Sequence, residues 1–136
     1  MSESSNHIDL VKLLAKWITE LLPPEDHSHM LIDIPENPRQ KKPPKLYGFV
    51  PDIFVLNTSR YAFVIGEAKT ATDVDNNHTT EQLTAFLRKC SENNNSLLVM
   101  AVPWHVVRLA RWVITHCKRE ARLDYIETKV VERLPG

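Results

Sequence analysis

The sequence predicts an α/β fold in a single domain spanning residues 1–136, with a central mixed sheet flanked by helices. Segments with helical periodicity alternate with short apolar segments of strand length, as expected for this class. The length of 136 residues suits one domain with one core. Hydrophobic residues make up 43% of the chain and charged residues 25%, which argues against disorder.

The N-terminal third predicts a helix, a short strand and an exposed loop. Apolar residues recur at helical spacing from residue 7 to residue 22, and two consecutive prolines end this pattern. A short strand is expected over residues 29–34. The segment 35–45 contains four prolines and four basic residues, so it is expected to be an exposed loop.

Two neighbouring strands are expected in the middle of the chain, over residues 47–56 and 61–70. Both are rich in β-branched and aromatic residues, and the polar segment 57–60 supplies a turn between them. Much of each strand is apolar on both faces. The sheet is therefore expected to be covered on both sides.

The C-terminal part predicts two helices and two strands. A helix is expected over residues 79–90, and the apolar run 96–102 has the length of a buried strand. An amphipathic helix follows over 104–119, and the alternating segment 123–131 is expected to be an edge strand. The complete order is α-β-β-β-α-β-α-β. The tryptophans fall at helical positions and are expected in the core: Trp17, Trp104 and Trp112.

Several classes of protein are disfavoured by what the sequence lacks. No apolar run approaches the roughly 18 residues of a membrane-spanning helix, and the first residues lack the apolar part of a secretory signal. Cys90 and Cys117 form no CxxC pair, so neither a disulfide framework nor a zinc site is expected, and the cytoplasm is the expected compartment. Three glycines provide no phosphate-binding loop, and no serine nucleophile motif is present.

The charge distribution permits a nucleic-acid partner without demonstrating one. The net charge is zero, but residues 1–36 carry seven acidic and two basic residues. Residues 37–136 therefore carry 15 basic residues against 10 acidic ones. This excess, which includes Arg39, Lys41, Lys42 and Lys45, could form a surface that faces phosphates. For any one of these residues, a solvated loop or helix face is the simpler interpretation.

Two acidic residues and a lysine mark the expected pair of strands. Glu67 and Lys69 share one face because side chains at i and i+2 of a strand point the same way. If the turn closes with Leu56 opposite Tyr61, Asp52 shares this face as the diagonal neighbour of Glu67. In that register Asp52 lies opposite Ile65, and a bulge would reverse the faces.

Such a cluster on an apolar hairpin requires a partner for its charges. Carboxylates without a cation repel each other or take up protons. A hard divalent ion resolves this conflict, and Mg²⁺ prefers oxygen ligands and keeps part of its water shell. The ion can activate a water and offset charge on a scissile phosphate, while Lys69 can orient or deprotonate that water.

At this point the sequence resembles a known family. Pro51-Asp52, followed fifteen residues later by Glu67-Ala68-Lys69, is similar to the motif of the PD-(D/E)xK, or restriction-endonuclease-like, nuclease superfamily. The expected elements also match the αβββαβ core of that family over about residues 8–102, with an added C-terminal helix and strand. The resemblance implies a metal-dependent (endo)deoxyribonuclease that hydrolyses phosphodiester bonds of DNA.

The resemblance also assigns roles to the residues of the motif. It implies that Asp52 and Glu67 are metal ligands, that the carbonyl of Ala68 is a further ligand, and that Lys69 is the catalytic lysine. The expected ion is Mg²⁺, with Mn²⁺ as a substitute. The chain is short and carries no evident DNA-recognition module, so a homodimer or a subunit of a larger DNA-processing complex is expected.

Two features of the family are matched less closely. Gln82 resembles the glutamine that some branches place beside the site, although Phe86 stands where those branches usually have a tyrosine. A plain position on the helix surface is the alternative for Gln82. Members often add an acid from the first helix, and Asp9 and Glu20 both remain open for this role.

Other functions remain open at the level of sequence. The motif is short, and Glu67 with Lys69 could be an ordinary exposed ion pair at the end of a strand. The chain could also be a catalytically inactive module with the nuclease fold that binds DNA or serves as a subunit of a DNA-processing complex. A third alternative is a general α/β protein in which the motif is a coincidence.

Overall fold

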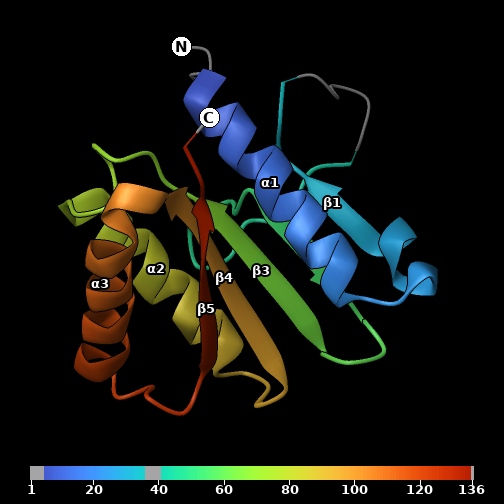
Figure 1. Ribbon diagram of the computed structural model, residues 1–136. Coiled ribbons are helices and arrows are strands. Elements are labelled where there is room, and N and C mark those ends of the chain that lie inside the picture. The colour runs from blue at the N-terminus through green and yellow to red at the C-terminus, as the bar shows by residue number, and fades with distance from the viewer. Residues whose placement is uncertain (1–4, 36–40, 136) are drawn as a thin grey trace.

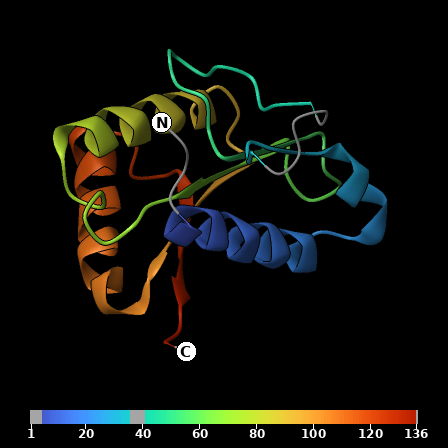
Figure 2. The same cartoon turned by 90° about the horizontal axis from the view of Figure 1, so that it is seen from above.

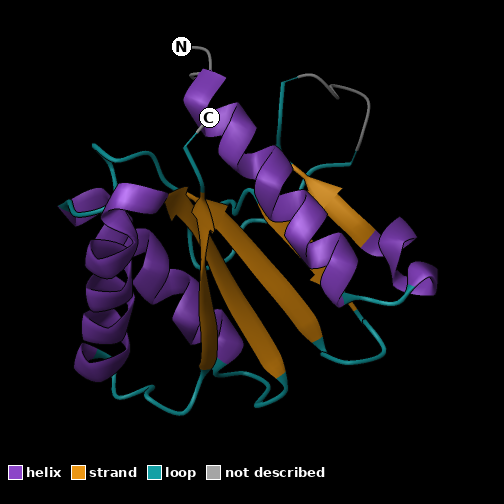
Figure 3. Cartoon of the chain, viewed as in Figure 1, coloured by secondary structure: helices purple, strands orange, loops and turns teal. Residues whose placement is uncertain are grey.

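The computed structural model describes residues 5–35 and 41–135, which form a five-stranded mixed sheet with helices on both faces (Figure 1). The strands lie in the order β1-β2-β3-β4-β5; β1, β2 and β3 are antiparallel neighbours, and β3, β4 and β5 run parallel. The expected α/β class is confirmed. The elements, drawn by type in Figure 3, are α1 (Ser5–Leu21), η1 (Pro24–His29), β1 (Met30–Ile32), β2 (Ile53–Leu56), β3 (Phe63–Ala68), α2 (Asn77–Cys90), β4 (Ser96–Pro103), η2 (Trp104–Val106), α3 (Val107–Glu120) and β5 (Glu127–Arg133).

Helix α1 alone covers one face of the sheet (Figure 2). Its apolar stripe belongs to a buried cluster that also contains residues from all five strands. At the centre of this contact Gly66 leaves no room for a side chain, because a Cβ there would lie 2.9 Å from Cδ2 of Leu14. The glycine therefore lets α1 approach the backbone of β3 closely. The buried residues of α1 are Leu10, Val11, Leu14 and Ile18.

Helices α2 and α3 cover the opposite face. The start of α2 is fixed by Asn76, whose side chain accepts a hydrogen bond of 2.8 Å from the N–H of Thr79. Both cysteines are free and buried in this layer, Cys90 at the end of α2 and Cys117 within α3. The two layers leave the central strands β3 and β4 almost completely buried, as the apolar sequence of both faces predicted.

The register of the hairpin differs from the expected one by two residues. Leu56 pairs with Phe63 and not with Tyr61, so continuing the ladder past Ile53 and Gly66 places Asp52 opposite Glu67. The connection is longer than expected because Asn57 adopts a left-handed conformation, with φ 57°, and its N–H bonds to the carbonyl of Ala62. A shift of two residues keeps every side chain on its face, so the three motif residues still converge.

Several strands are shorter than the sequence predicted. β2 starts at Ile53, because residues 46–49 form a tight turn with positive φ at Tyr47 and Gly48. β1 covers three residues of the expected six, and β5 starts at Glu127 and lies at the edge of the sheet, as expected. Of the expected loop 35–45, residues 36–40 lie outside the described part of the chain.

The tryptophans follow the core prediction only in part. Trp17 packs against the cluster under α1, but Trp104 is 49% exposed and Trp112 is 58% exposed. The prediction is wrong for these two. Trp112 lies off the buried stripe of α3, which smaller side chains form, and Trp104 lies in η2, none of whose residues is buried. In the described segments, no helix is both long and apolar enough to cross a membrane.

Candidate functional site

The site forms where β2 and β3 stop pairing with each other. Beyond the pair Ile53 and Gly66, side chains replace the backbone ladder: the N–H of Asp52 donates to Oε1 of Glu67 at 3.1 Å. In return, the N–H of Ala68 donates to Oδ2 of Asp52 at 2.8 Å. These reciprocal bonds hold the two carboxylates side by side at the end of the hairpin.

Lys69 joins the carboxylates from the end of β3. Its Nζ lies 3.3 Å from Oε2 of Glu67, and it donates a hydrogen bond to Oε1 of Gln82 on α2. The backbone is fixed as well, because the N–H of Lys69 donates to the carbonyl of Ala101 on β4 at 3.0 Å. The ammonium group is therefore held between a strand and a helix.

The four polar side chains are buried, which separates this cluster from an ordinary surface ion pair. Glu67 is 3% exposed, Asp52 and Lys69 are each 8% exposed, and Gln82 is 9% exposed. The alternative interpretations of an exposed pair and of a surface glutamine are therefore wrong. Burial of two acids, a lysine and an amide together is costly unless they serve each other or a ligand.

A histidine outside the motif also reaches the site. Nε2 of His7, in the first turn of α1, lies 3.3 Å from Oδ2 of Asp52. The sequence did carry a signal for this position. His7 precedes Val11, Leu14 and Ile18 at helical spacing, so it belongs to the stripe of α1 that faces the sheet.

The electrostatics of the site centre on Glu67. Burial raises the pKa of this carboxyl well above its ordinary value, and the neighbouring charge of Asp52 raises it further. The ammonium of Lys69 and the hydrogen bond from the N–H of Asp52 act in the opposite direction. The carboxyl therefore holds its negative charge only at an energetic cost, which a nearby cation would reduce.

The donor set matches the needs of a hard divalent ion. Within the described residues, no three or more His, Cys, Asp or Glu side chains gather as a metal-binding group. Mg²⁺ is commonly bound by one or two carboxylates and several waters, so Asp52 and Glu67 fit such an ion. Oδ1 of Asp52 takes part in none of the contacts above, and Ala68 lies inside the site through its bond to Asp52.

Neither candidate acid of the first helix lies at the site. Asp9 is exposed, and its Oδ2 lies 3.3 Å from NH2 of Arg133 on β5. Glu20 is exposed near the other end of α1. The residue that α1 brings to Asp52 is His7, so the expectation of an added acid from this helix is wrong for both positions.

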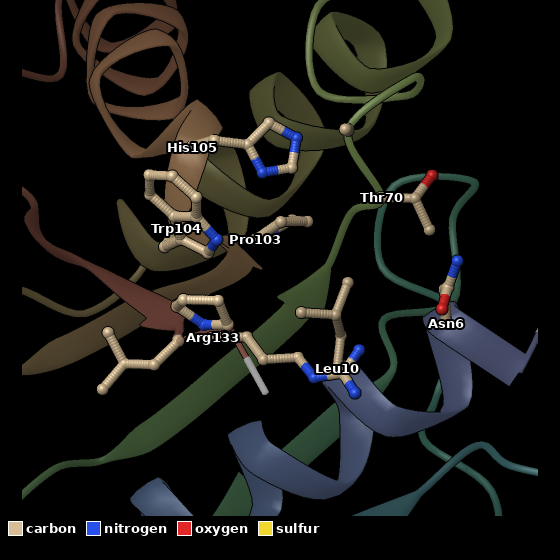
Figure 4. A pocket seen from close by; sticks show the side chains of 10 residues that line it. Asn6, Leu10, Thr70, Pro103, Trp104, His105 and Arg133 are labelled. Carbon is tan, nitrogen blue, oxygen red and sulfur yellow. The ribbon is translucent and has the colours of Figure 1, made fainter.

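A pocket of about 330 Å³ lies at the edge of the sheet where the parallel strands end, and its lining includes the chain neighbours of Lys69 and His7 (Figure 4). Its walls come from the start of α1, the segment after β3, the ends of β4 and β5, and η2. The lining residues are Asn6, Leu10, Thr70, Ala71, Pro103, Trp104, His105, Arg133, Leu134 and Pro135.

Comparison of the chain with known protein families, with curated proteins and with solved structures finds no match. The chemistry of the site therefore has to follow from its own side chains. They provide two buried carboxylates and a fixed ammonium group, and a pocket lies at the same edge of the sheet.

Proposed function

We propose that this chain is a Mg²⁺-dependent nuclease that hydrolyses phosphodiester bonds of DNA. The observation that supports this most is the buried convergence of Asp52, Glu67 and Lys69 at the end of one hairpin. These residues stand in a motif that resembles PD-(D/E)xK, and Gln82 meets Lys69 from the next helix. A structural ion pair would not require this combination of residue types in one place.

The order of elements supports the same proposal. The segment from α1 through β1, β2, β3 and α2 to β4 has the αβββαβ order of the restriction-endonuclease-like core. In this interpretation α3 and β5 are additions that extend the sheet at one edge. The proposed site lies at the end of β3, next to the carboxyl end of β4, where ligands commonly bind in open α/β sheets.

The proposed roles follow from the contacts. Asp52 and Glu67 hold the ion, with the carbonyl of Ala68 as a further ligand, and Mn²⁺ substitutes for Mg²⁺. When bound, the ion supplies an activated water and positive charge against the scissile phosphate. Lys69 offsets charge that develops on the phosphate or accepts a proton from the attacking water, and its contacts with Glu67 and Gln82 keep it in position.

Cleavage of supercoiled plasmid DNA tests the proposal. With Mg²⁺ the wild type is expected to nick or linearise the plasmid, and EDTA is expected to stop the reaction. Asp52→Ala and Lys69→Ala should each lower the rate by about 100-fold or more, because each removes a group needed for the chemistry. Two exposed charges away from the cluster and the pocket serve as matched controls, Asp124→Ala and Lys129→Ala, and should keep the wild-type rate.

The controls also define the outcome that would contradict the proposal. Equal cutting by wild type and both site variants would point to a contaminating nuclease. Absence of cutting of both plasmid and single-stranded DNA in Mg²⁺ and Mn²⁺ by a folded wild type would also overturn the assignment. Thermal unfolding of each variant shows whether a loss of activity follows a loss of structure.

A second candidate is a catalytically inactive module that binds DNA or serves as a subunit of a DNA-processing complex. One observation favours it: each carboxylate already accepts a bond from a backbone N–H and so has a structural role. Binding of DNA without cleavage would support this candidate. Either activity could require a homodimer or a larger complex, and the molar mass measured by light scattering with and without DNA tests this.

A further inference from the structure

The pocket at this edge of the sheet has the volume and the aromatic lining to hold a planar ring. Its volume of about 330 Å³ falls at the lower end of the range for small-ligand sites, roughly 300–1,000 Å³. Trp104 provides an indole that is about half exposed although it lines the pocket. The ring of His105 packs edge-on against it, with centroids 5.5 Å apart, which restricts how the indole can turn.

Polar groups surround this aromatic wall. In Figure 4, Trp104 and His105 come from one side of the pocket, Thr70 and Asn6 lie on the other, and Arg133 extends toward α1. The guanidinium group of Arg133 is held by Asp9 through one nitrogen, NH2, at 3.3 Å. An arginine carries five N–H donors, so others remain for an anionic or carbonyl oxygen.

The pocket and the proposed catalytic cluster are joined through neighbouring residues. Thr70, in the pocket, directly follows Lys69, and Asn6, in the pocket, directly precedes His7, which contacts Asp52. The carbonyl of Ala101, which fixes the backbone of Lys69, lies two residues before Pro103 in the pocket wall. A nucleotide next to a phosphate at the cluster therefore lies within reach of the pocket.

We propose that this pocket takes up the unstacked base of a nucleotide beside the scissile phosphate, with Trp104 as the stacking surface. This inference rests on the proposed function and names its substrate class: DNA with a single-stranded segment at the point of cleavage. A base inside a continuous duplex is stacked on both sides and must leave the helix to enter. An unpaired base enters without that penalty, and any base can stack on an indole.

Binding of a labelled oligothymidine of about ten nucleotides tests the inference, in Ca²⁺ to prevent cleavage. Trp104→Ala should weaken this binding by about 5- to 100-fold, because stacking of one base contributes in that range. Trp104→Phe should restore most of it. Trp112→Ala is the matched control: it removes an exposed tryptophan of the same size from α3, outside the pocket, and should change binding less than about twofold.

A second measurement detects the contact directly. In a chain carrying Trp17→Phe and Trp112→Phe, Trp104 is the only one of three indoles left, and oligothymidine should quench its fluorescence. A blunt duplex of the same length should quench it much less. Unchanged oligothymidine binding by Trp104→Ala, or equal losses in Trp104→Ala and Trp112→Ala, would overturn the inference.

The outcome separates this inference from the proposed function. If the wild type cleaves plasmid and Trp104→Ala binds oligothymidine normally, the pocket inference fails and the nuclease proposal stands. If Trp104→Ala loses oligothymidine binding but the wild type cleaves no DNA, the nuclease proposal fails. The base in the pocket then no longer lies beside a scissile phosphate. The pocket then remains a single-strand binding site only.

Discussion

The surrounding protein disfavours the charged form of the Glu67 carboxyl. This side chain is buried at the end of the hairpin, beside the carboxylate of Asp52, and its pKa is raised well above the ordinary value. A raised pKa in the folded state means that the contribution of this carboxyl to stability is present below its ordinary pKa. That contribution is lost as the pH rises through the raised pKa. At neutral pH the metal-free protein is therefore less stable than its packing allows.

Glu67→Gln is predicted to stabilise the metal-free chain while abolishing cleavage. Glutamine resembles the neutral carboxylic acid and can still accept the bond from the N–H of Asp52. The melting temperature at pH 7 is expected to rise above that of the wild type, because the amide replaces a carboxyl whose charged form is disfavoured by burial and by Asp52. Thermal unfolding in EDTA measures it, with the exposed Glu81→Gln as the control that should shift little.

Metal binding adds a second arm to this experiment. Mg²⁺ should raise the melting temperature of the wild type, because an ion that binds only the folded state stabilises it. It should leave Glu67→Gln nearly unchanged. If Glu67→Gln melts below the wild type in EDTA, the charged carboxylate of Glu67 stabilises the fold. The inactive-module alternative requires this result.

Among the elements, α1 packs closely against the backbone of the sheet. Its apolar stripe lies directly on β3, and the missing side chain of Gly66 is the space that Leu14 and Ile18 occupy. The same helix brings His7 to Asp52, so the position of α1 also determines the geometry at the proposed site. Packing under the helix and the arrangement of the site are therefore linked.

A double-mutant cycle between Gly66 and Leu14 is predicted to show this close approach. Gly66→Ala should destabilise the chain by about 1–3 kcal/mol through overpacking, and Leu14→Ala by about 2–5 kcal/mol through a cavity. In the double variant the new methyl group fills space vacated by Leu14. The double variant should therefore lose less stability than the sum of the losses in the two single variants. Denaturant unfolding of the four proteins measures the coupling, and strict additivity would show that the two positions do not share this space.

Periodicity predicted the elements well, because each pattern is imposed by the surface on which it packs. The stripe of α1 and the apolar run of β4 were both located this way. The pairing of Leu56 with Phe63 could not be predicted, since it depends on the left-handed backbone conformation of Asn57. Asparagine tolerates this conformation but adopts the right-handed and extended ones as well. The motif residues still met because an error of two residues preserves the face of a strand.

The parts of the site that come from different elements were harder to predict. Gln82 is buried because α2 crosses the end of β3, and a sequence pattern within α2 alone does not reveal that crossing. Trp104 and Trp112 were expected in the core because they fall at helical positions. However, α3 fills its inner face with smaller side chains, and Trp104 lies in η2 before that helix starts. Which face of a helix is buried depends on the shape of the layer beneath it.

At the scale of the whole molecule, one sheet serves two separate cores. The cluster under α1 and the cluster under α2 and α3 contain different side chains, but both draw on the alternate faces of β3 and β4. Loss of either layer would expose one complete face of these central strands. Neither core is therefore expected to persist without the other, and the proposed site at the end of β3 depends on both.

We therefore predict a single cooperative unfolding transition for residues on both faces. With Trp104→Phe and Trp112→Phe, the fluorescence of Trp17 reports on the layer of α1, while far-ultraviolet circular dichroism reports on all helices. The two denaturation curves should coincide, since a chain of 136 residues with shared central strands meets the conditions for two-state behaviour. Saturating Mg²⁺ should shift both curves equally, because the proposed ligands sit on the hairpin that joins the layers. A fluorescence midpoint below that of circular dichroism would mean that α1 detaches first, and the displaced His7 would then leave Asp52 before the rest of the site is lost.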